Sequence, residues 1–203
     1  LEGFLDFIKT KRAPAVSTGF KMLDDTLRGG LREGLICVGG ISSLGKTTLA
    51  LQIMDNIAKQ GQDVLIFSLE MSAYELRAKS IARESLNVSI DESGFSMDAV
   101  TTIEILDRVL MEELPKQNQA TFTKAYGRYM QYAKHIFIHE AVGEFTVNNI
   151  RARVEEHVKA TGRTPVVLVD YLQILQPAQQ GMSDKHKVSH DVLMLKQLSR
   201  DYH

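Results

Sequence analysis

The eight residues 40–47 constrain this chain more than any other segment. They read Gly-Ile-Ser-Ser-Leu-Gly-Lys-Thr and match the pattern G-x-x-x-x-G-K-[ST] at every fixed position. An apolar run at 35–38 precedes them, and a sequence with helical periodicity begins near Lys46. The glycines allow a tight loop whose backbone N–H groups point inward at the positive end of that helix. The pattern therefore predicts a P-loop that binds the phosphates of a nucleotide.

The polar groups of this loop have distinct expected roles. Lys46 is expected to reach the β and γ phosphates of ATP, and the hydroxyl of Thr47 is expected to bind Mg²⁺. A glycine turn without a ligand is the alternative, which the apolar run before the loop and the amphipathic helix after it disfavour. The other residues predicted to contact the nucleotide belong to the loop or follow it directly: Gly40, Ser43, Leu44, Gly45 and Thr48.

Composition narrows the class of protein. The chain has 203 residues, of which 44% are hydrophobic, enough to bury the core of one ordinary domain. Its 24 basic and 25 acidic residues give a net charge of -1, so no overall basic footprint indicates nucleic acid. A few basic groups lining a channel would not change that sum. Cys37 is the single cysteine and is expected to be a small buried residue of a strand.

Nothing in the sequence indicates a membrane or an exported protein. No apolar stretch approaches the roughly 20 residues that a membrane helix requires, and the first residues lack a signal-peptide pattern. With one cysteine, a disulfide within the chain is excluded. A cytoplasmic, reducing location is therefore the expectation.

Apolar runs alternate with helical patterns along the chain. The run at 64–69 is almost continuously apolar, as expected for a strand buried on both faces of a parallel sheet. Strands separated by helices require right-handed crossovers, which predicts an α/β fold with a mainly parallel sheet covered on both faces. The predicted strands are 35–38, 64–69, 136–138 and 166–169, and the predicted helices are 46–61, 72–86, 146–162 and one beginning near Val188.

Two segments lie outside this alternation. Residues 1–12 place apolar side chains on one helical face and precede an Ala-Pro-Ala sequence, which predicts a short helix and a hinge. Such a helix is too short to be stable alone, so it packs either on its own domain or on a neighbouring subunit. Residues 87–134 contain two helix-like stretches, 99–114 and 121–134, and are predicted to form a helical insertion. We therefore expect a linker helix and hinge at 1–14 and one α/β domain at 15–203.

Two carboxylates are expected at the carboxyl edge of the sheet. Asp170 ends the run at 166–169, which is the Walker B arrangement in which a carboxylate beside the P-loop supports Mg²⁺. Tyr171 follows it in place of a glutamate, so the group that activates water must come from elsewhere. Glu70, at the end of the neighbouring strand, is the predicted catalytic base, with Lys46 as the second catalytic residue. The alternatives are a turn or cap residue for Asp170 and a solvated first-turn acid for Glu70.

Together these motifs resemble the ATPase domain of replicative DNA helicases of the DnaB family. The similarity begins near Ser17 and extends to the end of the chain, and the motifs follow the order of the family. FSLEM with DYLQ is far more specific than the P-loop alone. The motifs are STGF and LD within 17–24, the P-loop, FSLEM at 67–71, IRAR at 150–153 and DYLQ at 170–173.

The resemblance implies a RecA-like P-loop NTPase fold and an ATP-dependent helicase subunit. Such a subunit couples ATP hydrolysis to translocation on single-stranded DNA and to duplex unwinding. By this resemblance Lys46 and Thr47 bind phosphate and Mg²⁺, Glu70 activates water and Asp170 supports the metal. The segment 1–12 resembles the linker helix through which such subunits form a homo-hexamer. Primase and a helicase loader are the further partners that the resemblance implies.

The chain also departs from the family pattern. The middle of the P-loop, Ser42-Ser43-Leu44, lacks the usual Gly or Pro, which affects only the expected tightness of binding. The family's later strands, with a glutamine sensor, a DNA-contacting loop and an arginine finger, are absent from these 203 residues. The 203 residues alone are therefore expected to hydrolyse ATP weakly, because an arginine finger contributes about 10³- to 10⁵-fold in rate.

DNA contacts and function each leave alternatives open. Lys185 and Lys187, in the polar segment after Asp170, are candidate contacts with DNA phosphates, and a solvated loop is the alternative. The spacing of five of the six histidines gives no support for zinc: His135, His139, His157, His190 and His203. A RecA-like or KaiC-like ATPase of recombination or signalling would share the same core. A non-catalytic assembly module that uses ATP only to join subunits is the remaining alternative.

Overall fold

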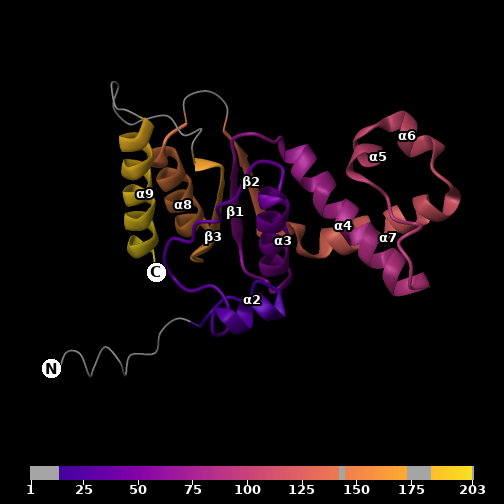
Figure 1. Cartoon of the computed structure of the whole chain (residues 1–203), viewed down its shortest axis with the longest axis horizontal. Coiled ribbons are helices and arrows are strands. Elements are labelled where there is room, and N and C mark those ends of the chain that lie inside the picture. Colours follow the sequence, from indigo (N-terminus) through magenta and orange to yellow (C-terminus); the bar gives the residue numbers. More distant parts are fainter. Residues whose placement is uncertain (1–13, 142–144, 173–183, 203) are drawn as a thin grey trace.

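A three-stranded parallel sheet lies at the centre of the computed structural model, which describes residues 14–141, 145–172 and 184–202 (Figure 1). β1 (Val64–Ser68) is the middle strand and pairs with β2 (Ile136–Glu140) on one side and with β3 (Val166–Asp170) on the other. The parallel sheet and its strands near 64–69, 136–138 and 166–169 are confirmed. The register places Ser68 beside both Glu140 and Asp170, so all three strands end at one edge.

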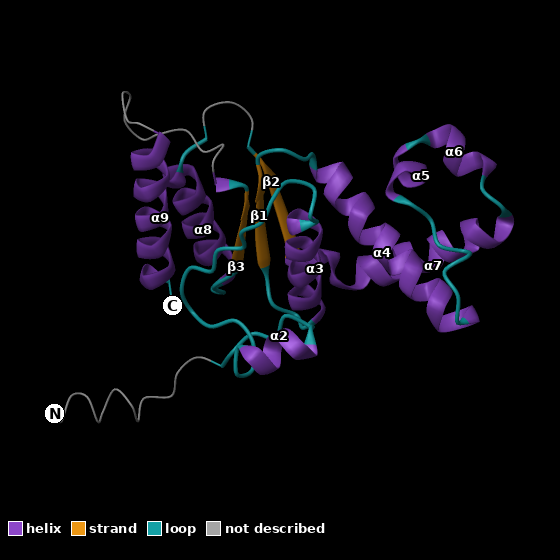
Figure 2. Cartoon of the chain, viewed as in Figure 1, coloured by secondary structure: helices purple, strands orange, loops and turns teal. Residues whose placement is uncertain are grey.

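Helices cover both faces of this sheet, as predicted. In Figure 2, α8 and α9 lie on one side of the strands and α3 on the other, while α4 to α7 extend away from the sheet. None of the described helices is long and apolar enough to cross a membrane. The described helices are α2 (Lys21–Thr26), α3 (Lys46–Lys59), α4 (Ala73–Ser93), α5 (Thr102–Leu106), α6 (Arg108–Glu113), α7 (Lys116–Tyr132), the 3-10 turn η1 (Ala133–His135), α8 (Val147–Thr161) and α9 (Asp184–Asp201).

Side-chain alternation along β1 builds a core on each face of the sheet. Val64 and Ile66 belong to a cluster that includes buried residues of α3, α4 and α7. Leu65 and Phe67 point the other way, into a cluster with buried residues of α8 and α9. All four side chains are at most 1% exposed. This burial on both faces explains why the sequence of β1 is almost continuously apolar.

Two of the predicted helix starts, at 72 and 146, are confirmed by their caps. Ser72 and Glu75 form a capping box at the start of α4, and Thr146 forms one with Asn149 at the start of α8. The predicted end of α4 near residue 86 is wrong, because the helix continues to Ser93. Gly94 ends it in the left-handed conformation, with a φ of 75°.

The predicted strand at 35–38 is not formed. Ile36 and Val38 are 54% and 52% exposed, and Cys37 is exposed, contrary to the prediction of a buried cysteine. A strand requires a backbone partner on a neighbouring strand. Among the described residues, the sheet ends at β3, whose five residues are all only half-buried. The apolar run thus lacks the ladder that would have buried it.

The helical insertion differs in detail from its prediction. The expected continuous stretch at 99–114 consists of two short helices, because Asp107 adopts an extended conformation between them. The Asp107 carboxylate then caps α6 by accepting the N–H groups of Val109 and Leu110, at 2.8 and 3.1 Å. α7 begins at Lys116, directly after Pro115, so the helix starts five residues before the predicted stretch 121–134.

The STGF and LD sequences within 17–24 fasten the N-terminal segment onto α3. Asp24 accepts hydrogen bonds from the hydroxyls of Ser17 and Thr18 at 2.6 and 2.7 Å, which lower the pKa of its carboxyl. Asn56 of α3 donates to the carbonyl oxygen of Thr18 at 2.9 Å. Gly19 has a φ of 78°, and a Cβ there would lie 2.3 Å from the Asn56 amide nitrogen. These motif residues therefore have a structural role.

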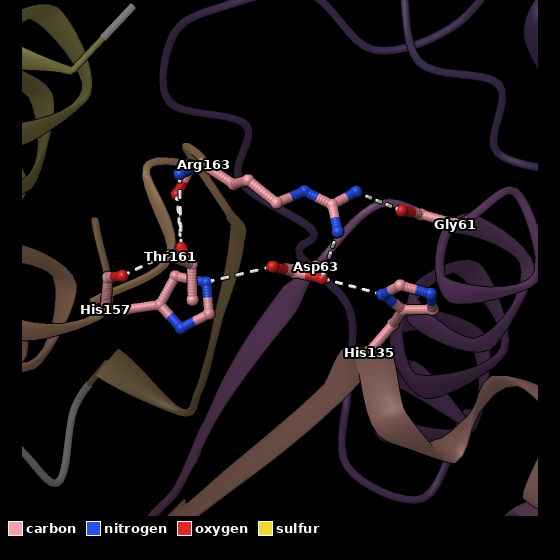
Figure 3. A network of polar contacts seen from close by, with 6 residues as sticks. All are labelled: Gly61, Asp63, His135, His157, Thr161 and Arg163. Carbon is pink, nitrogen blue, oxygen red and sulfur yellow. Dashed lines mark hydrogen bonds and ion pairs between the residues drawn. The ribbon is translucent and has the colours of Figure 1, made fainter. Parts of the chain in front are cut away.

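A polar network closes the amino edge of the sheet (Figure 3). Asp63, just before β1, is 4% exposed. Its carboxylate lies 2.7 Å from His135 Nδ1, 3.2 Å from His157 Nε2 and 3.3 Å from Arg163 Nη1. Arg163 also donates to the carbonyl oxygen of Gly61. The network joins the amino ends of β1 and β2 to the loop between α8 and β3.

These contacts determine the ionisation of Asp63. Burial alone would raise the pKa of its carboxyl, but the hydrogen bond from His135, the charge of Arg163 and the bond from His157 outweigh that effect and lower it. Within the described residues, no group of three or more His, Cys, Asp or Glu side chains could hold a metal ion. The contacts of Asp63 instead tie the amino ends of β1 and β2 to the loop between α8 and β3.

Candidate functional site

The predicted P-loop leads into the amino end of α3, on the side of the sheet that this helix covers (Figure 2). Ser43 and Gly45 both have left-handed backbone conformations, with φ of 64° and 83°. Glycine adopts this conformation without steric cost, so Gly45 meets a geometric need of the turn that leads into α3. Gly40, Ser43, Leu44, Gly45 and Thr48, the remaining predicted nucleotide contacts, are all exposed.

The two predicted metal ligands lie side by side. The Thr47 hydroxyl of α3 donates to Asp170 Oδ2 of β3 at 2.7 Å, although 123 positions separate them in the sequence. Both groups are half-buried at the junction of the helix and the sheet. A hydroxyl and a carboxylate are the oxygen ligands by which P-loop proteins hold Mg²⁺. The donor set therefore fits a magnesium ion bound with nucleotide phosphates.

Lys46 is held close to the loop. Its ammonium group donates to the carbonyl oxygen of Ile41 at 2.9 Å, which places the charge over the turn of the P-loop. The side chain is half-buried, whereas Ile41 is 74% exposed. A single bond to an exposed carbonyl is weak enough to be exchanged for a bond to an anion.

Glu70 lies two residues beyond the end of β1 and is exposed. The N–H of the preceding residue, Leu69, donates to the carbonyl oxygen of Asp170 at 2.8 Å. Glu70 therefore shares the edge of the sheet with Asp170, as the sequence predicted. Within the described part of the chain, the Glu70 side chain takes part in no hydrogen bond or ion pair. Its carboxylate is available to a ligand.

The structure corrects the expected setting of the candidate DNA contacts. Lys185 and Lys187 were predicted in a loop after Asp170, but both belong to α9, which begins at Asp184. The predicted helix start near Val188 is four residues late. Lys187 is half-buried, and the side chain of Lys185 is outside the described residues. Residues 1–12, the predicted linker helix, and residues 173–183 are also outside them.

Sequence reasoning missed two polar residues at the same edge. Glu140, the last residue of β2, accepts a hydrogen bond from the N–H of Ala73 at 2.6 Å. Ser68, the last residue of β1, donates its hydroxyl to the carbonyl oxygen of Met71 at 2.6 Å. The available signal was position, because both residues lie within two positions of the carboxyl end of a predicted parallel strand, at the edge where Glu70 and Asp170 were expected.

A pocket of about 660 Å³ lies elsewhere, at the opposite end of α3 and against α4 and α7. Its wall includes Lys59, 2.6 Å from Glu84, and Arg128, 2.7 Å from Asp91. The charges of both pairs are thus largely neutralised within the protein. Among the described residues, the P-loop alone combines a glycine turn, a helix amino end and a Thr–Asp oxygen pair, which makes it the stronger candidate for a phosphate ligand.

Known proteins resemble this chain over nearly its whole length. The family model of the DnaB-like helicase C-terminal domain matches residues 15–203. A probable replicative DNA helicase of Guillardia theta is 27% identical over 195 residues, which are 96% of this chain and 29% of that protein. The replicative DNA helicase DnaB of Geobacillus stearothermophilus is 29% identical over 189 residues, which are 92% of this chain and 37% of that protein.

The fold has close counterparts among solved structures. The structure of a DnaB-like replicative helicase, described with its interactions with primase, is 23% identical to this chain. It superposes with a TM-score of 0.75 and covers 99% of this chain and 46% of that one. The chain thus spans well under half the length of the two curated relatives.

Proposed function

This chain belongs to the DnaB-like helicase C-terminal domain family, and we propose that it is the ATP-hydrolysing motor of a replicative DNA helicase subunit. Its fold is RecA-like, with a parallel sheet covered on both faces by helices. The observation that carries the proposal is the 2.7 Å contact between the Thr47 hydroxyl and Asp170 Oδ2. It joins the P-loop to the end of the Walker B strand, where a nucleotide–magnesium complex is bound in such folds.

The residues of the loop have the roles that their positions support. The backbone of residues 40–45 and the amino end of α3 would bind the phosphate chain of ATP. Lys46 would leave the Ile41 carbonyl oxygen and bind the β and γ phosphates. Thr47 and Asp170 would hold Mg²⁺, which neutralises charge on the phosphates when bound.

Glu70 is the proposed general base. Its exposed carboxylate, without a partner among the described residues, would accept a proton from the water that attacks the γ phosphate. The backbone bond from Leu69 to Asp170 supports this role, because it keeps Glu70 at the edge where the phosphates would lie.

The proposed partners are those that the resemblance to helicases of the DnaB family implies. We propose single-stranded DNA as the track, with Lys185 and Lys187 as candidate phosphate contacts near the start of α9. A homo-hexamer formed through residues 1–12 would place such motors in a ring around the strand. The interaction with primase that describes the solved DnaB-like helicase makes primase a proposed partner, together with a helicase loader.

ATP hydrolysis by the longest natural form of this polypeptide tests the proposal. The rate should rise with single-stranded DNA, and Glu70→Gln should lower it about 10²- to 10⁴-fold, to a small but measurable rate, while nucleotide binding persists. Glu113→Gln is a matched control, because Glu113 is an exposed carboxylate at the end of α6, far along the chain from the P-loop. Hydrolysis that is indifferent to DNA would favour a recombination or signalling ATPase. A parent that assembles with ATP but never hydrolyses it would favour the assembly module.

A further inference from the structure

Glu70 lies in the short connection 69–72 between β1 and α4. Its own side chain takes part in no hydrogen bond or ion pair among the described residues, so no contact of the carboxylate itself fixes its direction. The backbone on either side of Glu70 must therefore set the position of the carboxylate.

The β1 end of the connection is fastened to the sheet. The N–H of Leu69 donates to the carbonyl oxygen of Asp170 at 2.8 Å. The Ser68 hydroxyl donates to the carbonyl oxygen of Met71 at 2.6 Å and accepts the N–H of Met71 at 3.2 Å. Ser68 is 3% exposed, which shields these bonds from water. The turn around Glu70 is thus closed on itself and tied to β3.

The α4 end of the connection is fastened to β2 by Glu140. The first N–H groups of a helix have no partner within the helix. The capping box supplies partners for the N–H groups of Ser72 and Glu75. The N–H of Ala73, between them, donates to Glu140 Oε1 at 2.6 Å. A carboxylate at this position is favoured by the helix dipole as well as by the hydrogen bond.

We propose that Glu140 is a positioning residue for Glu70. By holding the first turn of α4 against the end of β2, it fixes the far side of the connection and so the place of the Glu70 carboxylate. The register supports this role, because Ser68 lies between Glu140 and Asp170 and the connection is anchored on both flanks. The inference rests on the proposed function of Glu70 as the base.

Small displacements at this point have large effects on rate. An error of about 1 Å in the placement of a catalytic group costs about 10²-fold in turnover. Nucleotide binding depends on the P-loop, with which Glu140 makes no hydrogen bond or ion pair among the described residues. Loss of the Glu140 anchor should therefore lower kcat and leave nucleotide affinity unchanged.

Three variants of the longest natural polypeptide test the proposal by ATP hydrolysis and by equilibrium binding of a fluorescent ATP analogue. Glu140→Ala should lower kcat about 10- to 100-fold and change the dissociation constant less than about twofold. Glu140→Gln keeps an oxygen that can accept the N–H of Ala73 and should restore most of the rate. Glu140→Asp shortens the side chain and should show the same split if the alanine variant does not fold. Glu113→Ala, with an exposed carboxylate on α6, should match the parent.

The double variant Glu70→Gln, Glu140→Ala distinguishes failure of the Glu140 proposal from failure of the assignment of Glu70 as the base. In the Glu70→Gln background Glu140→Ala should cause no further loss of rate, because it acts through Glu70. An additional loss of tenfold or more would overturn the proposal, as would a parental kcat in Glu140→Ala. If Glu70→Gln itself hydrolyses ATP at the parental rate, the assignment of the base fails, whatever Glu140 does.

Discussion

At the amino edge of the sheet, the Asp63 carboxylate is 4% exposed and lies within 3.3 Å of two histidines and an arginine. At the carboxyl edge of the same strands, Glu70 is exposed and takes part in no hydrogen bond or ion pair within the described residues. A buried carboxylate must be paired, because an unpaired one is strongly destabilising. An exposed carboxylate can remain without a partner until a ligand arrives. One edge therefore maintains the fold, while the other is suited to chemistry.

Lys46→Ala tests this division between the two edges with the largest expected effect. Removal of the ammonium group should lower ATP hydrolysis about 10³-fold, since phosphate charge is then uncompensated in the transition state. The melting temperature should hardly change, because the described bond of Lys46 is to one exposed carbonyl oxygen. Steady-state kinetics and a thermal melt measure the two effects, with Lys134→Ala, an exposed lysine near the other edge, as control. A large fall in melting temperature would show that the P-loop also supports the fold.

Asp63→Asn should show the opposite behaviour. The amide cannot balance the charge of Arg163 or accept from both histidines as a carboxylate does, so unfolding should become easier by about 3 kcal/mol. The kcat of the folded variant should match that of the parent. Urea unfolding at pH 7 measures the loss. Asp91→Asn is the matched control, because its ion pair with Arg128 is exposed and worth less than about 1 kcal/mol. Equal losses in the two variants would contradict the special role of the amino edge.

The smallest expected effect is that of acid, which should remove the difference in unfolding free energy between Asp63→Asn and the parent. The pKa of Asp63 is lowered in the folded chain, so its contribution is complete above its ordinary pKa of 3.8 and is lost as the pH falls through the lower folded value. The two unfolding free energies should therefore converge only below about pH 4. Urea unfolding at a series of pH values measures this convergence. A difference already lost at pH 5.5 would contradict the assignment of the effect to the Asp63 carboxylate.

The sequence predicts the carboxyl edge better than the amino edge, for a physical reason. Glu70 and Asp170 end apolar runs, and parallel strands bring their carboxyl ends together, so order along the chain suffices. Asp63, His135 and His157 carry no comparable pattern, because strand register and helix orientation bring them together. Register is a property of the folded sheet and cannot be read from one strand.

Burial of an apolar run is a second property that sequence alone leaves open. The runs at 64–69 and 35–38 look alike, yet the first is the most buried strand and the second is an exposed loop. The difference is the number of neighbouring strands, two for β1 and none for 35–38 among the described residues. Helix ends were more predictable where a cap is local, as at Ser72 and Gly162. Asp107 is such a local cap, and its carboxylate marks the break between α5 and α6.

The long helix α4 connects the Glu140 contact to the projecting part of the molecule. The helix has 21 residues, so it is a rigid rod of about 32 Å whose near end is pinned beside the proposed base. The helix packs against α5 and α7 in the projecting part of the molecule (Figure 1). A shift of about 1 Å at the tip of such a rod tilts it by only about 2°. A force applied to the projecting part would therefore be transmitted along α4 to the hydrogen bond between Ala73 and Glu140, close to the proposed base Glu70.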